Sequence, residues 1–213
     1  MYDLILKNCQ IVNEDSIYHS DIAIKNERIA LINNTIDAEA QEIIDVEGKY
    51  VIPGMIDDQV HFREPGLTHK GSIATESRAA LAGGITSYFE MPNVNPTTTT
   101  NENLRNKFDL ASQKSVGNYS FYLGASNHNI EEIKRVDTSL AAGLKVFMGA
   151  STGDMLVDNP DTLEDIFKYC PVNIVTHCED TPTILKNEQI FAEKYGDDLN
   201  ATHHPYIRDD ISC

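Results

Sequence analysis

The stretch VIPGMIDDQVHFREPG, residues 51–66, decides the fold of this chain. Its apolar start is interrupted by a Pro-Gly pair and leads into a polar cluster. This pattern predicts a buried strand with polar groups at its carboxyl end. Because side chains alternate along an extended chain, we expect Gln59, His61 and Arg63 to share one face. These side chains are two possible metal-binding or hydrogen-bonding groups and one cation that could clamp a carboxylate. Their placement on one face favours a functional site over a charged surface loop.

Beyond this stretch, apolar strand patterns alternate with helical patterns. Four further strands are expected, and they end near Asn93, Ser126, Lys145 and His177. Strands that alternate with helices indicate parallel βα units. We expect Asn101 to be a helix N-cap, and we expect helices at residues 72–82, 101–115, 130–138, 160–169 and 182–194.

Five such strands predict an α/β fold, a truncated (β/α)8 TIM-type barrel of about five βα units, because a whole barrel has eight strands and about 250 residues. An open parallel sheet is the alternative. No glycine-rich loop follows a strand, which disfavours a nucleotide-binding doubly wound sheet. The start of the chain indicates a small β unit of meander type, so we expect two domains: residues 1–50 as the N-terminal part of a small β-sandwich-type unit, and residues 51–213 as an incomplete metal-dependent (β/α) barrel.

Composition narrows the class of partner. The formal net charge is −16, which argues against nucleic acid and against an anionic membrane as partners. A small anionic substrate would then need a local positive clamp. The chain shows neither an uncharged run of transmembrane length nor a signal pattern, and its four cysteines lack CxxC spacing. These features predict a reducing, cytoplasmic location.

Three side chains at strand ends are candidates for metal chemistry. Lys145 lies within an apolar strand, so it must be paired, neutralised or modified. A carbamate formed there from carbon dioxide could bridge two metal ions, whereas a salt bridge or an edge position would be structural. His177 follows an apolar run, and together with His61 it favours zinc, which could activate water and polarise a carbonyl. Asn93 could bind a substrate carboxylate or simply form a turn.

The motifs PGMIDDQVHFREPG, MPNVNP, GLKVFMGASTG and VTHCED resemble a dihydroorotase of the amidohydrolase superfamily along the whole chain. The resemblance implies reversible hydrolysis of the cyclic amide of dihydroorotate to N-carbamoyl-aspartate in pyrimidine biosynthesis. It also implies one or two zinc ions, with His61 and His177 as ligands and Lys145 as the carboxylated bridging residue. Arg63 and Asn93 would hold the substrate carboxylate.

The chain departs from this family pattern at two places. Gln59 stands where the family has the first histidine of a His-x-His pair, and its amide oxygen is a weaker ligand than imidazole. The family also supplies a further histidine and a catalytic aspartate from later strands, which we expect beyond Cys213. The 213 residues alone should therefore hydrolyse the substrate poorly or not at all.

Two other functions compete with this one. Gln59 motivates a non-catalytic dihydroorotase-like protein that associates with aspartate carbamoyltransferase. The presence of four residues argues against it: Arg63, Asn93, Lys145 and His177. An allantoinase or hydantoinase is the other alternative, and Arg63 disfavours it. Besides the small anionic substrate, a homodimer or association with aspartate carbamoyltransferase are the partners that the resemblance suggests.

Overall fold

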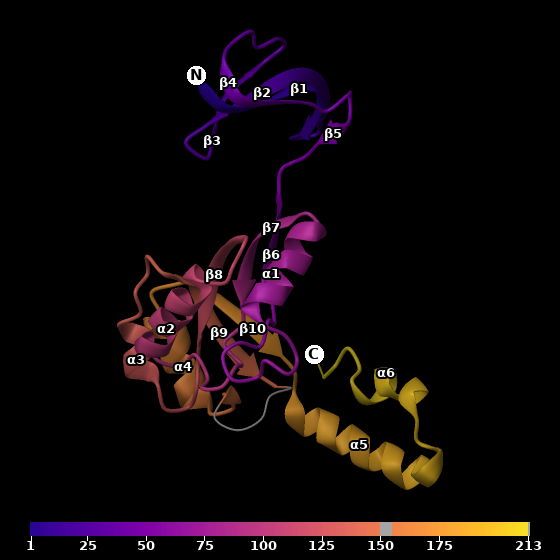
Figure 1. Ribbon diagram of the computed structural model, residues 1–213. Helices are drawn as coiled ribbons and strands as arrows, with labels where there is room; N and C mark the ends of the chain where they lie inside the picture. Colours follow the sequence, from indigo (N-terminus) through magenta and orange to yellow (C-terminus); the bar gives the residue numbers. More distant parts are fainter. Residues whose placement is uncertain (150–154, 213) are drawn as a thin grey trace. The chain divides into compact units, whose positions relative to one another are not determined.

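The computed structural model describes residues 1–149 and 155–212. The chain separates into two compact units, Met1–Met55 and Ile56–Cys213. Two five-stranded sheets account for the strands (Figure 1). The division into domains at residue 50 stays a prediction, because compactness does not test whether a unit folds alone.

The N-terminal sheet begins as a meander but does not end as one. β1 (Tyr2–Asn13), β2 (Ser16–Lys25) and β3 (Arg28–Asn33) follow each other as antiparallel neighbours. In contrast, β4 (Ala40–Asp45) and β5 (Tyr50–Val51) pair in parallel with β1, and the order is β3-β2-β1-β4. The meander prediction was therefore right for the first three strands only, because the chain crosses over between β3 and β4.

A buried carboxylate stabilises an irregularity in β1. The register with β2 shifts between Leu6 and Cys9, and Asn8 within this shift has a left-handed φ of 59°. Asp21 accepts hydrogen bonds from the backbone N–H of Asn8 at 2.9 Å and from Lys7 Nζ at 2.8 Å. It also accepts the backbone N–H of Ile36 at 2.9 Å. These bonds satisfy backbone groups that the strand ladder leaves unpaired.

The second unit contains a parallel sheet in sequential order. Its strands run in the order β10-β9-β8-β7-β6, which is also their order along the chain. A doubly wound sheet would reverse direction within this order, so the winding is that of a barrel. This confirms the predicted α/β class. The strands are β6 (Met55–Val60), β7 (Ile85–Glu90), β8 (Asn118–Gly124), β9 (Ala141–Met148) and β10 (Ile174–Cys178).

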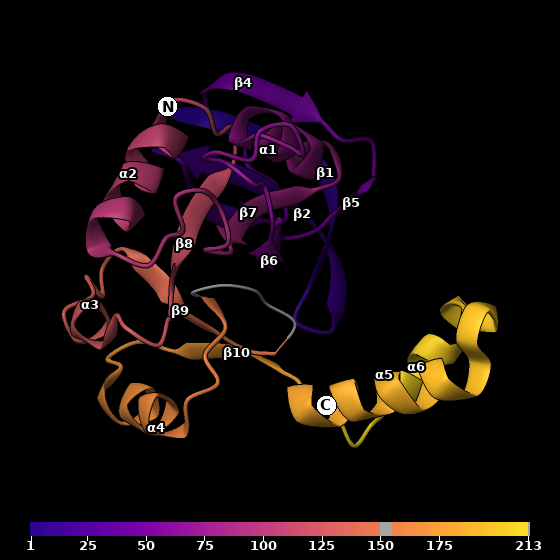
Figure 2. The ribbon, with the colours of Figure 1, turned by 90° about the horizontal axis from the view of Figure 1, so that it is seen from below.

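A helix follows each strand of this sheet. Figures 1 and 2 show α2, α3 and α4 together on one side of the strands. Their apolar side chains pack on that face in a core that includes Leu104, Phe121, Leu144 and Ile166. None of the helices in the described residues is long and apolar enough to cross a membrane. The helices are α1 (Ile73–Ala82), α2 (Asn101–Ser112), α3 (Ile130–Lys134), α4 (Pro160–Tyr169), α5 (Thr181–Tyr195) and the short α6 (His204–Ile207).

One predicted helix cap was wrong. Thr100 is the N-cap of α2, and its side chain accepts the backbone N–H of Asn103. Asn101 is already helical, and its side-chain amide donates to the backbone oxygen and the carboxylate of Glu132 at 2.9 and 2.8 Å. A tertiary partner thus replaced the local bond that an N-cap asparagine would make.

The apolar start of residues 51–66 is not buried as predicted. Ile52, Met55 and Ile56 are 60%, 55% and 65% exposed. β6 is the last strand of the described sheet and pairs there with β7, so one edge of β6 is an edge of that sheet. Burial begins at Val60 and Phe62, which pack with Tyr88 beneath the helices.

Candidate functional site

The predicted site residues lie at or near the carboxyl ends of four strands. His61 follows β6, Asn93 follows β7, Lys145 is in β9 and His177 is in β10. Parallel strands of one sheet carry these ends at the same edge. The fold therefore brings residues from distant parts of the sequence to one rim.

His61, Arg63 and Asn93 form one contact group. His61 Nδ1 and Asn93 Oδ1 are 2.8 Å apart and share a hydrogen bond. Arg63 Nη1 donates to the backbone oxygen of Asn93 at 3.4 Å. The alternation prediction holds for His61, since Val60 and Phe62 on either side of it are buried. Arg63 leaves the alternation, because its φ of 69° is left-handed.

Lys145 and His177 lie on one face of neighbouring strands. His177 is paired in register with Phe147, and Phe147 lies two residues after Lys145 and so on the same face. Lys145 Nζ is 5.1 Å from the centre of the Phe147 ring, and the His177 ring centre is 6.5 Å from it. The end of the GLKVFMGASTG motif, residues 150–153, lies outside the described residues.

The charges of these residues influence one another. Burial lowers the pKa of His61, and the positive charges of Arg63 and Lys145 lower it further. Burial also lowers the pKa of Lys145, which is 3% exposed. Both shifts favour the neutral forms. A neutral imidazole is the form that binds metal ions, and a neutral amine is the form that reacts with carbon dioxide.

The donor set fits a metal in part. Among the described residues, no group of three or more His, Cys, Asp or Glu side chains is placed to hold a metal ion. Lys145 is not of these types, and it is buried with no carboxylate partner in the described part of the chain. The Nε2 atom of His177 is buried without a hydrogen bond there. Gln59 is exposed and stands apart: its backbone N–H donates to Asp57 Oδ1 at 3.0 Å, and its side chain makes no hydrogen bond to the described residues.

One acidic residue at the rim escaped the sequence reasoning. Glu179 Oε2 lies 3.5 Å from His177 Nε2, and both its oxygens accept from Arg208 Nη1, at 2.6 and 2.7 Å. Burial opposes its ionisation, but Arg208 and His177 hold the pKa of Glu179 below its usual value. A carboxylate two residues after a strand-end histidine was the available signal, whereas Arg208 is too distant in sequence to be paired with it by pattern.

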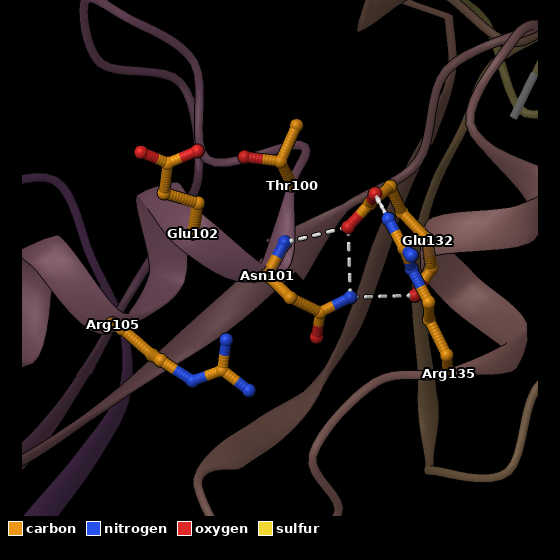
Figure 3. A pocket seen from close by; sticks show the side chains of 6 residues that line it. All are labelled: Thr100, Asn101, Glu102, Arg105, Glu132 and Arg135. Atoms are coloured by element: carbon orange, nitrogen blue, oxygen red, sulfur yellow. Dashed lines mark hydrogen bonds and ion pairs between the residues drawn. The ribbon is translucent and has the colours of Figure 1, made fainter.

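A separate pocket of about 360 Å³ lies where α2 begins and α3 passes. The Glu132 carboxylate in this pocket is already engaged, because it accepts the backbone N–H of Asn101 and pairs with Arg135 (Figure 3). None of the predicted site residues lines this pocket. Its lining consists of Thr100, Asn101, Glu102, Arg105, Glu132 and Arg135.

Comparisons with known proteins agree with this architecture. A family model described as Dihydro-orotase-like matches residues 48–146. An allantoinase of Desulfitobacterium hafniense is 36% identical over 183 residues, 84% of this chain and 41% of that protein. An L-hydantoinase of Paenarthrobacter aurescens is 34% identical over 94% of this chain and 45% of its own length. A dihydroorotase of Methanothermobacter thermautotrophicus is 30% identical over 100% of this chain and 47% of its own length.

Solved structures give the same result. The L-hydantoinase of Arthrobacter aurescens superposes with a TM-score of 0.92 at 31% identity, over 100% of this chain and 48% of that one. A D-hydantoinase from Thermus sp. superposes with a TM-score of 0.74 at 25% identity, over 98% of this chain and 47% of its own. The chain thus spans about half the length of the relatives it matches, and its sheet is a partial TIM barrel. It belongs to the cyclic amidohydrolase family of dihydroorotases, allantoinases and hydantoinases, of whose members it corresponds to the N-terminal half.

Proposed function

We propose that the full-length protein hydrolyses a cyclic amide that carries a carboxylate, and that it interconverts dihydroorotate and N-carbamoyl-aspartate. The observation that carries this proposal is the guanidinium of Arg63 beside Asn93 and His61 at the strand ends. A chain with a net charge of −16 repels anions at long range, so a carboxylate substrate requires such a local cation.

Arg63 and Asn93 have distinct tasks in this reaction. The planar guanidinium binds the carboxylate with two parallel hydrogen bonds, which fixes the orientation of the ring as well as its position. Asn93 uses Oδ1 to hold His61, and because its amide N–H groups bond to none of the described residues, they can donate to the substrate. The ring is thereby oriented with its amide toward the rim residues.

His61, Lys145 and His177 are the residues that would hold zinc, with Lys145 carboxylated. Zinc supplies a Lewis acid for the amide carbonyl and lowers the pKa of water. Hydrolysis breaks the ring C–N bond, and water adds across it. Gln59 would contribute a weaker ligand than histidine, so the affinity for one metal ion should be reduced. Association with aspartate carbamoyltransferase or with a second copy, and the cytoplasmic location, stay predictions.

The test compares substrates with and without a carboxylate. For Arg63→Ala in the full-length protein, we expect the KM for dihydroorotate to rise about 10- to 100-fold, the loss of a charge-assisted pair. Arg63→Lys, which keeps the charge without the planar fork, should be intermediate. The kcat/KM for dihydroorotate should exceed that for neutral allantoin in the unmodified protein. An unchanged KM in Arg63→Ala would remove the clamp from the proposal.

Allantoin hydrolysis is the second candidate. The allantoinases among the relatives share 36% to 39% identity with this chain, against 30% for the dihydroorotase. Allantoin has no carboxylate, so Arg63→Ala would leave its KM nearly unchanged. A higher kcat/KM for allantoin than for dihydroorotate would replace the first proposal with this one.

A further inference from the structure

Glu90 is a fully buried carboxylate directly beneath the Arg63 turn. It ends β7 and is 0% exposed. Its Oε1 accepts the backbone N–H of Arg63 at 3.0 Å. One side chain of β7 therefore binds an amide of the chain that leaves β6.

Lys107 on α2 is the counter-ion of Glu90. Its Nζ lies 2.9 Å from Glu90 Oε2 and donates to the backbone oxygen of Met91 at 3.2 Å. It is 1% exposed and lies 4.7 Å from the centre of the Phe121 ring. A buried ion pair adds little net stability over apolar residues of the same size. Stability alone thus gives little reason for this pair.

The backbone at Arg63 needs external support. A left-handed φ costs a non-glycine residue about 1–2 kcal/mol. Arginine cannot offset this cost with a local side-chain bond, as asparagine can. The Glu90 carboxylate supplies the missing bond, and the backbone N–H of Met91 ties the same strand end by donating to Val60 at 3.0 Å. Arg63 leaves this turn with its guanidinium beside Asn93.

We propose that Glu90 and Lys107 are positioning residues that hold the left-handed turn at Arg63 and so direct its guanidinium toward the substrate carboxylate. The substrate part of this inference rests on the proposed function, whereas the hold on the turn does not. Lys107 acts through Glu90, since its ammonium favours the ionised carboxylate against the effect of burial and holds it in place within the core. Neither side chain touches the substrate.

The first measurement needs no variant. Amide hydrogen exchange of Arg63 in the unmodified full-length protein should be strongly protected, although the residue lies outside any strand or helix. Exchange at the rate of an open loop would overturn the proposal. This result does not depend on which cyclic amide the protein hydrolyses.

The second measurement uses Glu90→Gln/Lys107→Met, which removes both charges and leaves no unpaired one. We expect exchange at Arg63 to accelerate about tenfold or more, and the KM for dihydroorotate to rise about tenfold while kcat changes less than about threefold. Faster exchange with an unchanged KM would overturn the positioning role. If the unmodified protein instead prefers allantoin while Arg63 stays protected, the proposed function fails and the hold on the turn stands.

The matched control is Asp21→Asn in the N-terminal unit. Asp21 is likewise a buried carboxylate that accepts backbone N–H groups, from Asn8 and Ile36, and pairs with a lysine ammonium. This variant should lower stability without changing the exchange at Arg63 or the KM. A rise in KM equal to that of Glu90→Gln/Lys107→Met would mean that general loosening explains both, and would overturn the proposal.

Discussion

Asp21 in the N-terminal unit and Glu90 in the barrel unit make nearly the same bonds in two different sheets. Each is a buried carboxylate that accepts backbone N–H groups, two at Asp21 and one at Glu90, and pairs with one lysine. Each also binds the amide of a residue with left-handed φ, Asn8 at 59° and Arg63 at 69°. The same local device thus supports an irregular strand in one unit and the candidate site in the other.

The two devices differ in burial and in the residue they hold. The side chain of Lys7 is 26% exposed, whereas that of Lys107 is 1% exposed. Asparagine adopts left-handed φ readily, but arginine does not. The Asp21 group therefore completes a conformation that its sequence already favours. The Glu90 group imposes a conformation that its sequence disfavours, and such imposed conformations concentrate at functional sites.

Removal of each lysine should give the largest contrast. Lys107→Met leaves the Glu90 carboxylate buried without its counter-ion, and we expect a loss of about 3–5 kcal/mol in the free energy of unfolding. Lys7→Met leaves a carboxylate that keeps both amide bonds, at a lysine site that is 26% exposed and can be reached by water, and about 1 kcal/mol should be lost. Urea denaturation of both variants measures the difference. Equal losses would show that burial does not distinguish the two groups.

The second largest difference is expected in how the stability contributed by Asp21 and by Glu90 changes at acid pH. Burial opposes the ionisation of Asp21, but the hydrogen bonds from Lys7, Ile36 and Asn8 hold its pKa below the usual value. Its folded pKa therefore lies below the unfolded value of about 3.9, so its stabilisation is present above that pH and is lost as the pH falls through the folded pKa. Burial raises the pKa of Glu90, so its folded pKa lies above the unfolded one. Its contribution is retained in acid and declines as the pH rises through the folded pKa.

Asp21→Asn should therefore flatten the acid side of the stability curve by about 1–2 kcal/mol. Glu90→Gln/Lys107→Met should make that side no flatter than in the unmodified protein, and steeper over the pH range where Glu90 titrates, because Glu90 opposes the loss of stability in acid. Urea midpoints measured at a series of pH values from neutral to acid test both statements. A flatter acid side in the Glu90 variant would contradict the assigned direction of its pKa.

Glycine at the two left-handed positions should reveal how much backbone strain each holds. Arg63→Gly should be more stable than Arg63→Ala by about 1–2 kcal/mol, because glycine removes the steric penalty of left-handed φ. Thermal or urea unfolding of this pair gives the value directly. No difference between glycine and alanine would mean that the turn relaxes once the arginine is gone.

Asn8→Gly should have the smallest effect. Asparagine already tolerates its φ of 59°, so the change relative to the unmodified protein should stay within about 0.5 kcal/mol. The same unfolding measurement applies. A gain as large as the difference at Arg63 would remove the distinction between the two held residues.

Local patterns predicted the class of fold and the position of the strand ends well. The alternation around His61 and the apolar strands before Asn93 and His177 depend on neighbours in sequence, and sequence records these directly. The exposed run at Ile52 and Ile56 could not be foreseen in this way. Its burial depends on which strands lie beside β6, and periodicity does not report that.

The residues that hold the site are the least visible in the sequence. A carboxylate at the end of the apolar strand ITSYFE is a signal for Glu90, since a buried charge needs partners. Lys107 lies in a polar helix where a lysine is ordinary, and its partner is in another element. The parallel pairing of β4 with β1 and the N-cap at Thr100 were not predicted for the same reason: tertiary contacts determine both.

The position of Lys107 over the Phe121 ring has a kinetic consequence. Phe121 belongs to the main apolar core of the barrel unit, so one residue joins that core to the turn at Arg63. The turn cannot release its amide by the fraying common to surface loops, because Glu90 would first have to leave an ammonium that is seated in the core. The opening reaction that exposes the Arg63 amide should therefore be as rare as the sub-global opening of the core itself. Conditions that change the opening rate of the core should change the rate at Arg63 in the same direction.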